Sequence, residues 1–409
     1  MDLTELTGAI LSYGEICDHC LGRMVGKRSF GLTNDQRGRA LRISFYLARN
    51  EPYSPHEGVC WICQDFFEGT GEWADRVVAA LEGIEFSTFV IGTRIPPLMA
   101  EGEEMVWSDL SLTFAEPLKS EINREVGKAV AERTGNEADL TRPDVVVILD
   151  PVSGTVEVQV NPVFFSGRYR KLERGIPQTH WDCRICRGKG CERCGFTGKQ
   201  YPDSVEELIG RPAMELFGAE GAVLHGAGRE DIDARMIGTG RPFVMEVVSP
   251  RRRAIDLRTV EQAVNAQAEG RVEVSLSGWS RREDVETIKS DKAHKKYRIL
   301  VEIDGPLSFS ELKSALEGLK GVTIEQRTPQ RVVHRRADKI RERKVLDIDL
   351  VGSGDDGFVI DVTGEAGLYI KELISGDSGR TRPSLTEVLG KPARVTQLDV
   401  IQVRGSAEE

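Results

Sequence analysis

The sequence predicts an α+β protein of two or three domains. Its 409 residues exceed the usual size of a single domain. Strand-like and helix-like segments alternate through the C-terminal half, and a hairpin pattern ends a separate region near residue 160. A connector rich in glycine and cysteine lies between the two halves. The apolar fraction of 40% and the charged fraction of 29% are those of an ordinary globular protein.

The N-terminal half combines helical and strand patterns. Residues 1–48 are helical in pattern around the first pair of cysteines, and a further helix is expected at Glu121–Arg133. A strand is expected at Glu85–Ile91. The clearest unit is a hairpin, in which the turn DPVSG joins two strands rich in β-branched residues. These strands are Asp144–Leu149 and Thr155–Val160.

A new folding region is expected to begin at Ser204, after the connector at 166–200, and to continue to about residue 405. It contains strand patterns at Tyr297–Ile303 and Val345–Leu350 and a helical pattern at Phe309–Leu319. The composition changes near residue 200, which places a domain boundary there.

Membrane and secreted proteins are excluded by two observations. No run of 18 apolar residues exists, so no transmembrane helix is expected. The N-terminus, MDLTELTGAI, carries acidic residues and no basic segment, unlike a signal peptide. We therefore expect a cytoplasmic protein.

The net charge of −10 argues against a nucleic-acid partner, but binding depends on local patches rather than on the average. Residues 327–344, RTPQRVVHRRADKIRERK, hold eight lysines and arginines against two acids. A second basic cluster is formed by the arginines at 251–253. A single charge run is usually a solvated face. Two such clusters in an acidic chain favour an anionic partner.

All eight cysteines stand in Cys-x-x-Cys pairs, which predicts structural zinc. In this spacing both thiolates face one ion while intervening amides donate to the sulfurs, and four thiolates close a tetrahedral site. The alternatives are redox pairs or free thiols, and His19, His56 and His180 lie close enough in sequence to replace a ligand. The first expected set is Cys17, Cys20, Cys60 and Cys63, and the second is Cys183, Cys186, Cys191 and Cys194. Neither set leaves an open position for catalysis.

Three segments of the C-terminal half are candidates for a functional site. The segment 225–243, HGAGREDIDARMIGTGRPF, has no amphipathic period and is expected to be a polar loop. Its Asp231 and Asp233 could bind a metal, act as a base, cap a helix or form surface salt bridges. Tyr297 lies in the segment KKYRI and opens an expected strand, and the alternative is that it is only a partly buried strand aromatic. Lys371 lies in GEAGLYIKELISGD, which lacks the lysine-serine pattern of a nucleotide-binding P-loop.

Together these segments resemble the Pus-ten family of tRNA pseudouridine synthases. GREDIDARMIGTGRPF resembles the family's catalytic motif and KKYRI resembles its base-stacking strand. GLYIKEL resembles the TruB-type motif of related enzymes, which contributes to the target-base pocket. The resemblance implies that Asp231, not Asp233, is the catalytic carboxylate and that Lys371 is its basic partner. It implies that Tyr297 and Tyr369 bind the target base. It also implies that TPQRVVHRRADKIRERK grips the RNA, through Arg335, Arg336, Arg341 and Arg343.

The N-terminal half resembles the same family. LTRPDVVVILDPVSGTVEVQVNPVFFSGRYRK looks like the end of a THUMP-type RNA-binding domain, with residues 167–171 as its basic exit. The first cysteine set matches the zinc site expected in the family. One departure is Lys371, where the related TruB-type motif usually has arginine.

The resemblance implies a catalytic domain at 204–409 with a mixed, largely antiparallel sheet. It also implies a zinc-binding segment at 1–70, a THUMP-like domain at 50–172 and a connector at 173–203. The expected activity is isomerisation of uridine to pseudouridine in the T loop of tRNA, at tRNA positions 54 and 55. Zinc is expected and an organic cofactor is not. tRNA is the expected partner, without a membrane or a protein partner. The alternatives are a tRNA-binding module without catalysis and a metal-dependent nuclease.

Overall fold

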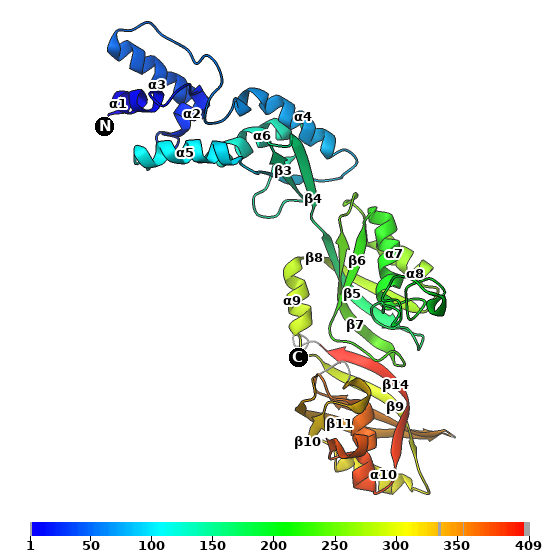
Figure 1. Cartoon of the computed structure of the whole chain (residues 1–409). Helices are drawn as coiled ribbons and strands as arrows, with labels where there is room; N and C mark the ends of the chain where they lie inside the picture. The colour runs from blue at the N-terminus through cyan, green and yellow to red at the C-terminus, as the bar shows by residue number, and fades with distance from the viewer. Residues whose placement is uncertain (1, 334–336, 355, 405–409) are drawn as a thin grey trace. The chain divides into compact units, whose positions relative to one another are not determined.

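The chain, drawn in Figure 1, divides into two units, and each has a large hydrophobic core of its own. The computed structural model describes residues 2–333, 337–354 and 356–404. One core lies in the unit Met1–Asn161 and the other in the unit Pro162–Glu409, here called unit 1 and unit 2. In the described part of the chain, no helix is long and apolar enough to cross a membrane.

Unit 1 packs helices against a small mixed sheet of order β2-β1-β3-β4. β1 pairs in parallel with β2 and β3, and β3 pairs antiparallel with β4 across the predicted turn. The strands are β1 (Thr88–Thr93), β2 (Glu137–Ala138), β3 (Val145–Asp150) and β4 (Thr155–Val160). The helices are α1 (Leu3–Leu11), α2 (Asp18–Arg23), α3 (Asn34–Arg49), η1 (Phe66–Gly69), α4 (Thr70–Ala80), α5 (Pro97–Asp109) and α6 (Leu118–Thr134).

The predicted hairpin of unit 1 is confirmed, and β4 has the predicted bounds. The predicted helix at Glu121–Arg133 lies within α6, which ends at Thr134 and is capped by Gly135 in the left-handed conformation that glycine adopts readily. The strand expected at Glu85–Ile91 lies later, at Thr88–Thr93, because the parallel pairing with β2 and β3 begins at Thr88 and Phe89.

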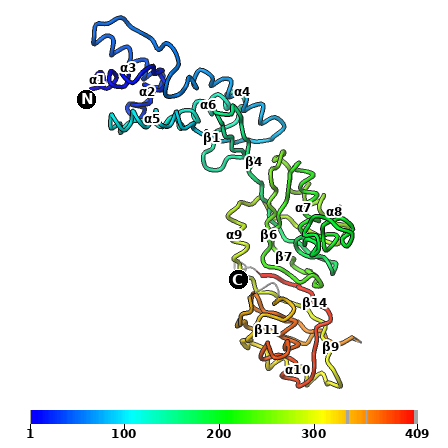
Figure 2. The backbone as a smooth tube through the Cα atoms, viewed as in Figure 1, coloured from blue at the N-terminus to red at the C-terminus, as the bar shows by residue number. Residues whose placement is uncertain are grey.

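Unit 2 is built on one ten-stranded sheet, and the predicted mixed, largely antiparallel arrangement is confirmed. The strand order is β13-β10-β11-β12-β9-β14-β7-β5-β8, with β6 paired to β7. Among the strands that the structure describes in this unit, the parallel pair is β14 with β7. β14 comes from the C-terminal end of the chain and lies between β9 and β7, as Figure 2 traces.

The strands of unit 2 are β5 (Val163–Lys171), β6 (Gly221–Gly226), β7 (Arg235–Val248), β8 (Val272–Ser280), β9 (His294–Ile303), β10 (Thr323–Arg327), β11 (Ile340–Gly354), β12 (Gly357–Gly364), β13 (Thr381–Arg382) and β14 (Ala393–Arg404). The helices are η2 (Glu192–Cys194), α7 (Val205–Phe217), α8 (Leu257–Gln267), α9 (Arg282–Ser290), α10 (Phe309–Glu317), η3 (Gln330–Val332), α11 (Ile370–Ser375), η4 (Gly376–Gly379) and α12 (Leu385–Leu389).

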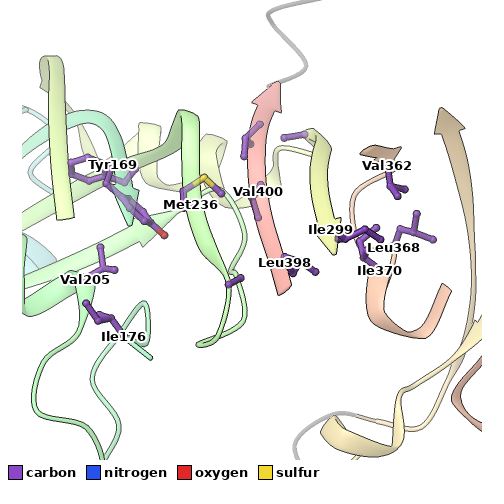
Figure 3. Close-up of a cluster of buried hydrophobic side chains, with 14 of the residues drawn as sticks. Tyr169, Ile176, Val205, Met236, Ile299, Val362, Leu368, Ile370, Leu398 and Val400 are labelled. Carbon is purple, nitrogen blue, oxygen red and sulfur yellow. The ribbon is translucent and has the colours of Figure 1, made fainter. Parts of the chain in front are cut away.

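The core of unit 2 runs along the sheet. Figure 3 shows Tyr169 of β5, Met236 of β7, Val400 of β14 and Ile299 of β9 as successive members of one buried cluster. Leu368 and Ile370 belong to the same cluster and anchor the segment before α11. Burial of Leu368 and Ile370 therefore fixes the position of Tyr369, which lies between them.

Two expectations about unit 2 need correction. Residues 167–171, expected as the basic exit of a domain ending at 172, form part of β5, which pairs with β7 and β8 of unit 2. Tyr169 and Lys171 are fully buried there. The polar loop expected at 225–243 is confined to about 227–234, since Arg235–Val248 is the strand β7 and finds partners in β5 and β6.

Candidate functional site

A pocket of about 370 Å³ opens in unit 2, where the loop 227–234 meets β9, β14, η3 and the segment before α11. Side chains of Leu398 and Val400 from β14 and of Tyr297 from β9 contribute to its lining. The structure brings Asp231, Tyr297, Tyr369 and Lys371 together here, although they lie far apart in the sequence.

A network of buried polar side chains holds the loop 227–234 in place. The hydroxyl of Tyr169 donates to Glu230 at 2.9 Å, and the Arg241 guanidinium lies 2.8 Å from the same carboxylate, with both charged side chains fully buried. Gln178 donates to the Gly228 carbonyl at 3.0 Å. Arg241 Nη1 also donates to the Ala227 carbonyl at 2.6 Å, so these contacts fix the backbone on either side of Arg229.

Lys171 holds the other end of this loop. Its Nζ donates to the carbonyls of Ile232 at 3.1 Å, Asp231 at 3.3 Å and Ile176 at 2.8 Å. Burial lowers the pKa of Lys171 to about 8. The cation is therefore a structural clamp on the backbone of Asp231 rather than a surface charge.

Asp231 lies in a cluster of cations at the mouth of the pocket. Arg331 Nη1 approaches Asp231 Oδ2 at 3.0 Å, and Lys371 Nζ lies 3.7 Å from the same oxygen. Arg331 Nε also contacts Glu372 at 2.7 Å, and the Glu372 side chain is only 5% exposed. Among the described residues Arg331 thus makes the shorter contact with Asp231, while Lys371, the partner expected from the sequence, lies farther away.

Asp233 shares Lys371 with Asp231. Lys371 Nζ donates to Asp233 Oδ2 at 2.6 Å. Burial alone would raise the pKa of Asp233, but the ion pair with Lys371 outweighs it and holds that pKa below its ordinary value. Of the roles left open for the two carboxylates, ion pairing is the one that both have in this structure.

The two tyrosines of the predicted site differ in how they are fixed. Burial raises the pKa of Tyr297 to about 12, so its hydroxyl stays protonated at neutral pH. The backbone of Tyr369 exchanges two hydrogen bonds with the buried side chain of Gln326, at 2.8 and 2.9 Å. Tyr369 precedes α11, so this amide clamp sets both the ring and the start of the helix that carries Lys371.

Lys295 is a site residue that the sequence analysis missed. It lines the pocket on β9, and in the part of the chain that the structure describes no carboxylate or hydrogen-bond acceptor contacts its Nζ. Burial, with the Arg241 charge beside it, lowers the pKa of Lys295 to about 8. Arg331 was also missed, although it lies inside the basic segment noticed in the sequence. No local pattern distinguishes it from its neighbours.

The expected RNA-gripping arginines lie on or before β11. Arg335 and Arg336 fall outside the described residues. Arg341 donates to Thr328 Oγ1 at 2.9 Å, and Arg343 Nε donates to the Ala366 carbonyl at 2.8 Å. Arg343 thereby supports the glycine turn beside Tyr369. The arginines at 251–253 follow β7 and do not line the pocket.

The eight cysteines form the two expected clusters. Within each set of four, the ligand atoms all lie within 4.8 Å of one another. A tetrahedral zinc with bonds of about 2.3 Å places its sulfurs ~3.8 Å apart. Cys17 Sγ and Cys63 Sγ are 3.6 Å apart, and Cys191 Sγ and Cys194 Sγ are 3.8 Å apart. Both clusters could therefore hold zinc.

Backbone amides favour thiolates in both clusters. The amide of Cys20 donates to Cys17 Sγ, and those of Gly190 and Gly198 donate to Cys186 and Cys194. The first cluster is largely buried in the core of unit 1, whereas the second is mostly accessible. The hairpin around the second cluster also carries Trp181, whose ring faces the Arg229 guanidinium at 5.2 Å.

Comparisons with known proteins agree along the whole chain. The family model described as "Pus10, C-terminal" matches residues 164–404, and the model "Pus10 THUMP domain, archaeal" matches 73–150. A relative named tRNA pseudouridine synthase Pus10 from Methanothrix thermoacetophila is 47% identical over 99% of this chain and 95% of its own. Relatives with the same name from Halorubrum lacusprofundi and Pyrococcus furiosus are 45% and 39% identical and cover nearly all of both chains.

A solved structure, a Cbf5-Nop10-Gar1 complex, has a chain that is 18% identical, with a TM-score of 0.32 over 49% of this chain and 45% of its own. The family assignment rests instead on the sequence relatives and on the two matched models. With identities well above 30% over almost the full length, the chain belongs to the Pus10 family.

Proposed function

We propose that this chain is a tRNA pseudouridine synthase that acts on uridines 54 and 55 of the T loop, with Asp231 as its catalytic carboxylate. The main support for this proposal is the pocket around Asp231. Its lining includes two tyrosines and two cations, namely Tyr297, Tyr369, Arg331 and Lys371. The names of the full-length relatives supply the reaction and the class of RNA. The T-loop positions follow from the family resemblance.

The reaction breaks the bond between the uracil and its ribose, turns the base and rejoins it through carbon. A uridine in folded RNA must first leave its stack. The pocket of about 370 Å³ accommodates one such nucleotide and offers the Tyr297 ring as a stacking face. The Tyr297 hydroxyl, which is protonated at neutral pH, can also donate a hydrogen bond to the base.

Asp231 must be ionised to act as a nucleophile or base. Arg331 contacts the Asp231 carboxylate at 3.0 Å and the Lys371 ammonium lies 3.7 Å from it, so both cations orient this side chain. Arg331 is itself oriented by Glu372, so the carboxylate is held by a positioned charge rather than by a mobile one. This arrangement leaves Asp231 in the pocket lining, where a flipped nucleotide would meet it.

A metal-dependent nuclease is the less favoured alternative. It would require Asp231 and Asp233 to share a cation, and the Lys371 ammonium already occupies the position between them. A binding module without catalysis would give no reason for a charge-stabilised carboxylate beside a pocketed tyrosine.

We further propose that each cysteine cluster binds one structural zinc. Zinc would cross-link α2 to the turn at Cys60–Cys63 in unit 1 and close the hairpin around residues 183–194 in unit 2. In both cases its contribution is to folding, since four thiolates fill the coordination sphere. Reduced cysteines suit the cytoplasm, where we place the protein.

The direct test is incubation of the full chain with an unmodified tRNA transcript, followed by mapping of pseudouridine. We expect modification at tRNA positions 54 and 55. Pseudouridine at other tRNA positions would overturn the T-loop assignment and leave the activity standing. Absence of pseudouridine with zinc-replete protein would overturn the proposed function.

A further inference from the structure

The most basic stretch of unit 1 lies outside both matched family models. Residues 23–49 hold seven lysines and arginines against one acid, Asp35, in a chain of net charge −10. Three of these cations face carboxylates, since Arg23, Arg42 and Arg49 pair with Glu103, Asp18 and Glu51. Within the described residues, Lys27, Arg28, Arg37 and Arg39 have no carboxylate partner. Three of these four, Lys27, Arg28 and Arg37, lie in the loop that follows α2 or contact it, and their charge favours an anionic ligand at that loop.

The loop between α2 and α3, residues 24–33, is held in a defined shape. The two helices touch through glycines: a Cβ at Gly38 would meet the Asp18 carbonyl at 1.8 Å. Arg37 reaches back from α3 and donates to the carbonyls of Arg28 at 3.2 Å and Ser29 at 2.9 Å. The Arg28 guanidinium in turn lies 4.4 Å from the Phe114 ring centroid. The loop is therefore a built surface rather than a loose connection.

This fixed loop presents an aromatic ring to solvent. Phe30 is 97% exposed, although the core of unit 1 buries other aromatic side chains such as Phe66 and Phe89. A large apolar side chain held away from the core, with Lys27 and Arg28 beside it in the sequence, marks an interaction site. It contributes nothing to the packing of this unit.

A groove of about 290 Å³ adjoins the loop. Its walls are mainly apolar, from Leu3, Val25, Leu32 and Leu41, and Arg28 and Arg37 contribute to its lining. An apolar slot with cations on its lining fits a flat aromatic group that carries a negative charge nearby. A nucleotide has this combination, with a base for the slot and a phosphate for the guanidinium groups.

We propose that Phe30 and this groove bind an unpaired segment of RNA. One base stacks on the Phe30 ring and a neighbouring base enters the groove, while the phosphates lie against Lys27 and Arg28. Stacking on a protein aromatic requires an unpaired base, so a duplex is not the ligand. The inference rests on the proposed function for RNA as the partner, and it adds a second contact that is separate from the pocket around Asp231.

Charge and shape favour RNA over an acidic peptide. A peptide carboxylate would satisfy Lys27 and Arg28 but would leave the Phe30 ring and the apolar slot without a matching surface. Cations interleaved with an exposed aromatic are the recurring arrangement of single-strand RNA sites.

The test uses the full chain and labelled hexa-adenylate, which offers no uridine to the pocket around Asp231. Binding is measured by fluorescence anisotropy at two salt concentrations, beside an RNA duplex and poly-glutamate as competitors. We expect Phe30→Ala to weaken hexa-adenylate binding about ten-fold and Phe30→Trp to retain it. Arg28→Gln should weaken binding and lower its salt dependence.

Two matched controls come from the same unit. Leu140 is an 85% exposed apolar residue away from the groove, and Arg39 is an exposed cation of α3 that does not line it. Leu140→Ala and Arg39→Gln should bind hexa-adenylate as the wild type does. An unchanged affinity in Phe30→Ala would overturn the proposal, as would equal competition by the duplex or by poly-glutamate.

Pseudouridine formation on unmodified tRNA is measured with the same preparations. If the wild type forms none, the proposed function fails. If the wild type forms pseudouridine and Phe30→Ala binds hexa-adenylate normally, only the groove proposal fails.

Discussion

Asp231 lies beside two cations that are held in place to different degrees. Arg331 contacts both Asp231 and the nearly buried Glu372, whereas Lys371 divides its charge between Asp231 and the exposed Asp233. An arginine fixed by a buried carboxylate holds its geometry better than a lysine at the pocket mouth. Arg331 is therefore the main positioning residue for Asp231 in this account.

We predict that Arg331→Met lowers the single-turnover rate of pseudouridine formation by about 100-fold or more, because it leaves Asp231 and Glu372 without their shared partner. Lys371→Met should have a smaller effect, since Arg331 remains on Asp231. Arg331→Lys should restore only part of the rate, because one ammonium cannot bridge both carboxylates. A larger loss in Lys371→Met than in Arg331→Met would show that the lysine is the dominant partner.

Lys295 places a cation on β9 that makes no ion pair with any described residue, and burial together with the charge of Arg241 lowers its pKa to about 8. The unfolded chain has the ordinary lysine pKa of about 10.4. Between these values the unfolded chain binds more protons than the folded one, so the unfolding free energy contributed by Lys295 rises with pH. At neutral pH the protonated side chain therefore destabilises the fold.

We predict that Lys295→Met is more stable than the wild type at pH 7 and that this advantage shrinks by about 1–2 kcal/mol at pH 9.5. Urea unfolding at the two pH values measures the change. Lys313→Met, at an exposed lysine of α10, is the matched control and should show no such pH dependence. An advantage of Lys295→Met that stays constant with pH would contradict the lowered pKa.

At the scale of elements, the two cysteine clusters stabilise different parts of the fold. The first lies in the core of unit 1, with Cys20, Cys60 and Cys63 fully buried among apolar residues. The second lies in the segment 183–194 of unit 2, where Cys183 is buried and the other three cysteines are partly exposed.

We predict two zinc ions per chain by metal analysis of protein purified without chelators. Cys60→Ser should lose one zinc and markedly lower the thermal stability of unit 1, because metal-binding free energy is folding free energy. Cys183→Ser should lose the other zinc and leave the unfolding of unit 1 unchanged. A chelator should remove the accessible zinc first. Finding no zinc, or the opposite order of release, would contradict the assignment.

The strand β11 combines two functions in neighbouring arginines. Arg341 donates to Thr328 near η3, while Arg343 supports the turn beside Tyr369 through the Ala366 carbonyl. Both were expected to grip RNA phosphates, but only the second also holds the wall of the pocket.

We therefore predict that Arg341→Gln weakens tRNA binding without changing the single-turnover rate. The slope of log affinity against log salt concentration should fall by about one, the value for one lost phosphate contact. Arg343→Gln should also lower that rate, because the Tyr369 turn loses its support. Equal single-turnover rates in the two variants would show that Arg343 acts only on RNA. An unchanged salt dependence in Arg341→Gln would show that Arg341 does not contact a phosphate.

At the scale of the whole molecule, the parts of the fold that depend on local pattern could be predicted from the sequence. The hairpin of β3 and β4 and the helix α6 have periodicity and turn residues within a few positions. The parallel pairing of β14 with β7 could not be predicted from local pattern, because it joins residues more than 160 positions apart through Arg235 and Asp399. The division of residues 225–243 into a short loop and the strand β7 depends on partners from β5 and β6.

The candidate site shows the same division. Asp231, Tyr297, Tyr369 and Lys371 were identified because each lies in a motif that resembles the family's. Arg331, Lys295 and Lys171 also lie in segments that resemble the family's, but nothing in those segments singles them out. Their importance comes from burial and from neighbours that only the fold brings together. Phe30 likewise drew no attention in the sequence, because only the structure shows that its ring is exposed to solvent.

The central claim is that Asp231, and not the neighbouring Asp233, carries out the chemistry in this pocket. The most direct measurement compares wild type, Asp231→Asn and Asp233→Asn on unmodified tRNA, mapping pseudouridine and measuring tRNA affinity in parallel. We predict that Asp231→Asn forms no pseudouridine yet binds tRNA with nearly unchanged affinity, because phosphate contacts supply most of that affinity. Asp233→Asn should remain active. Full activity in Asp231→Asn, or loss only in Asp233→Asn, would contradict the account.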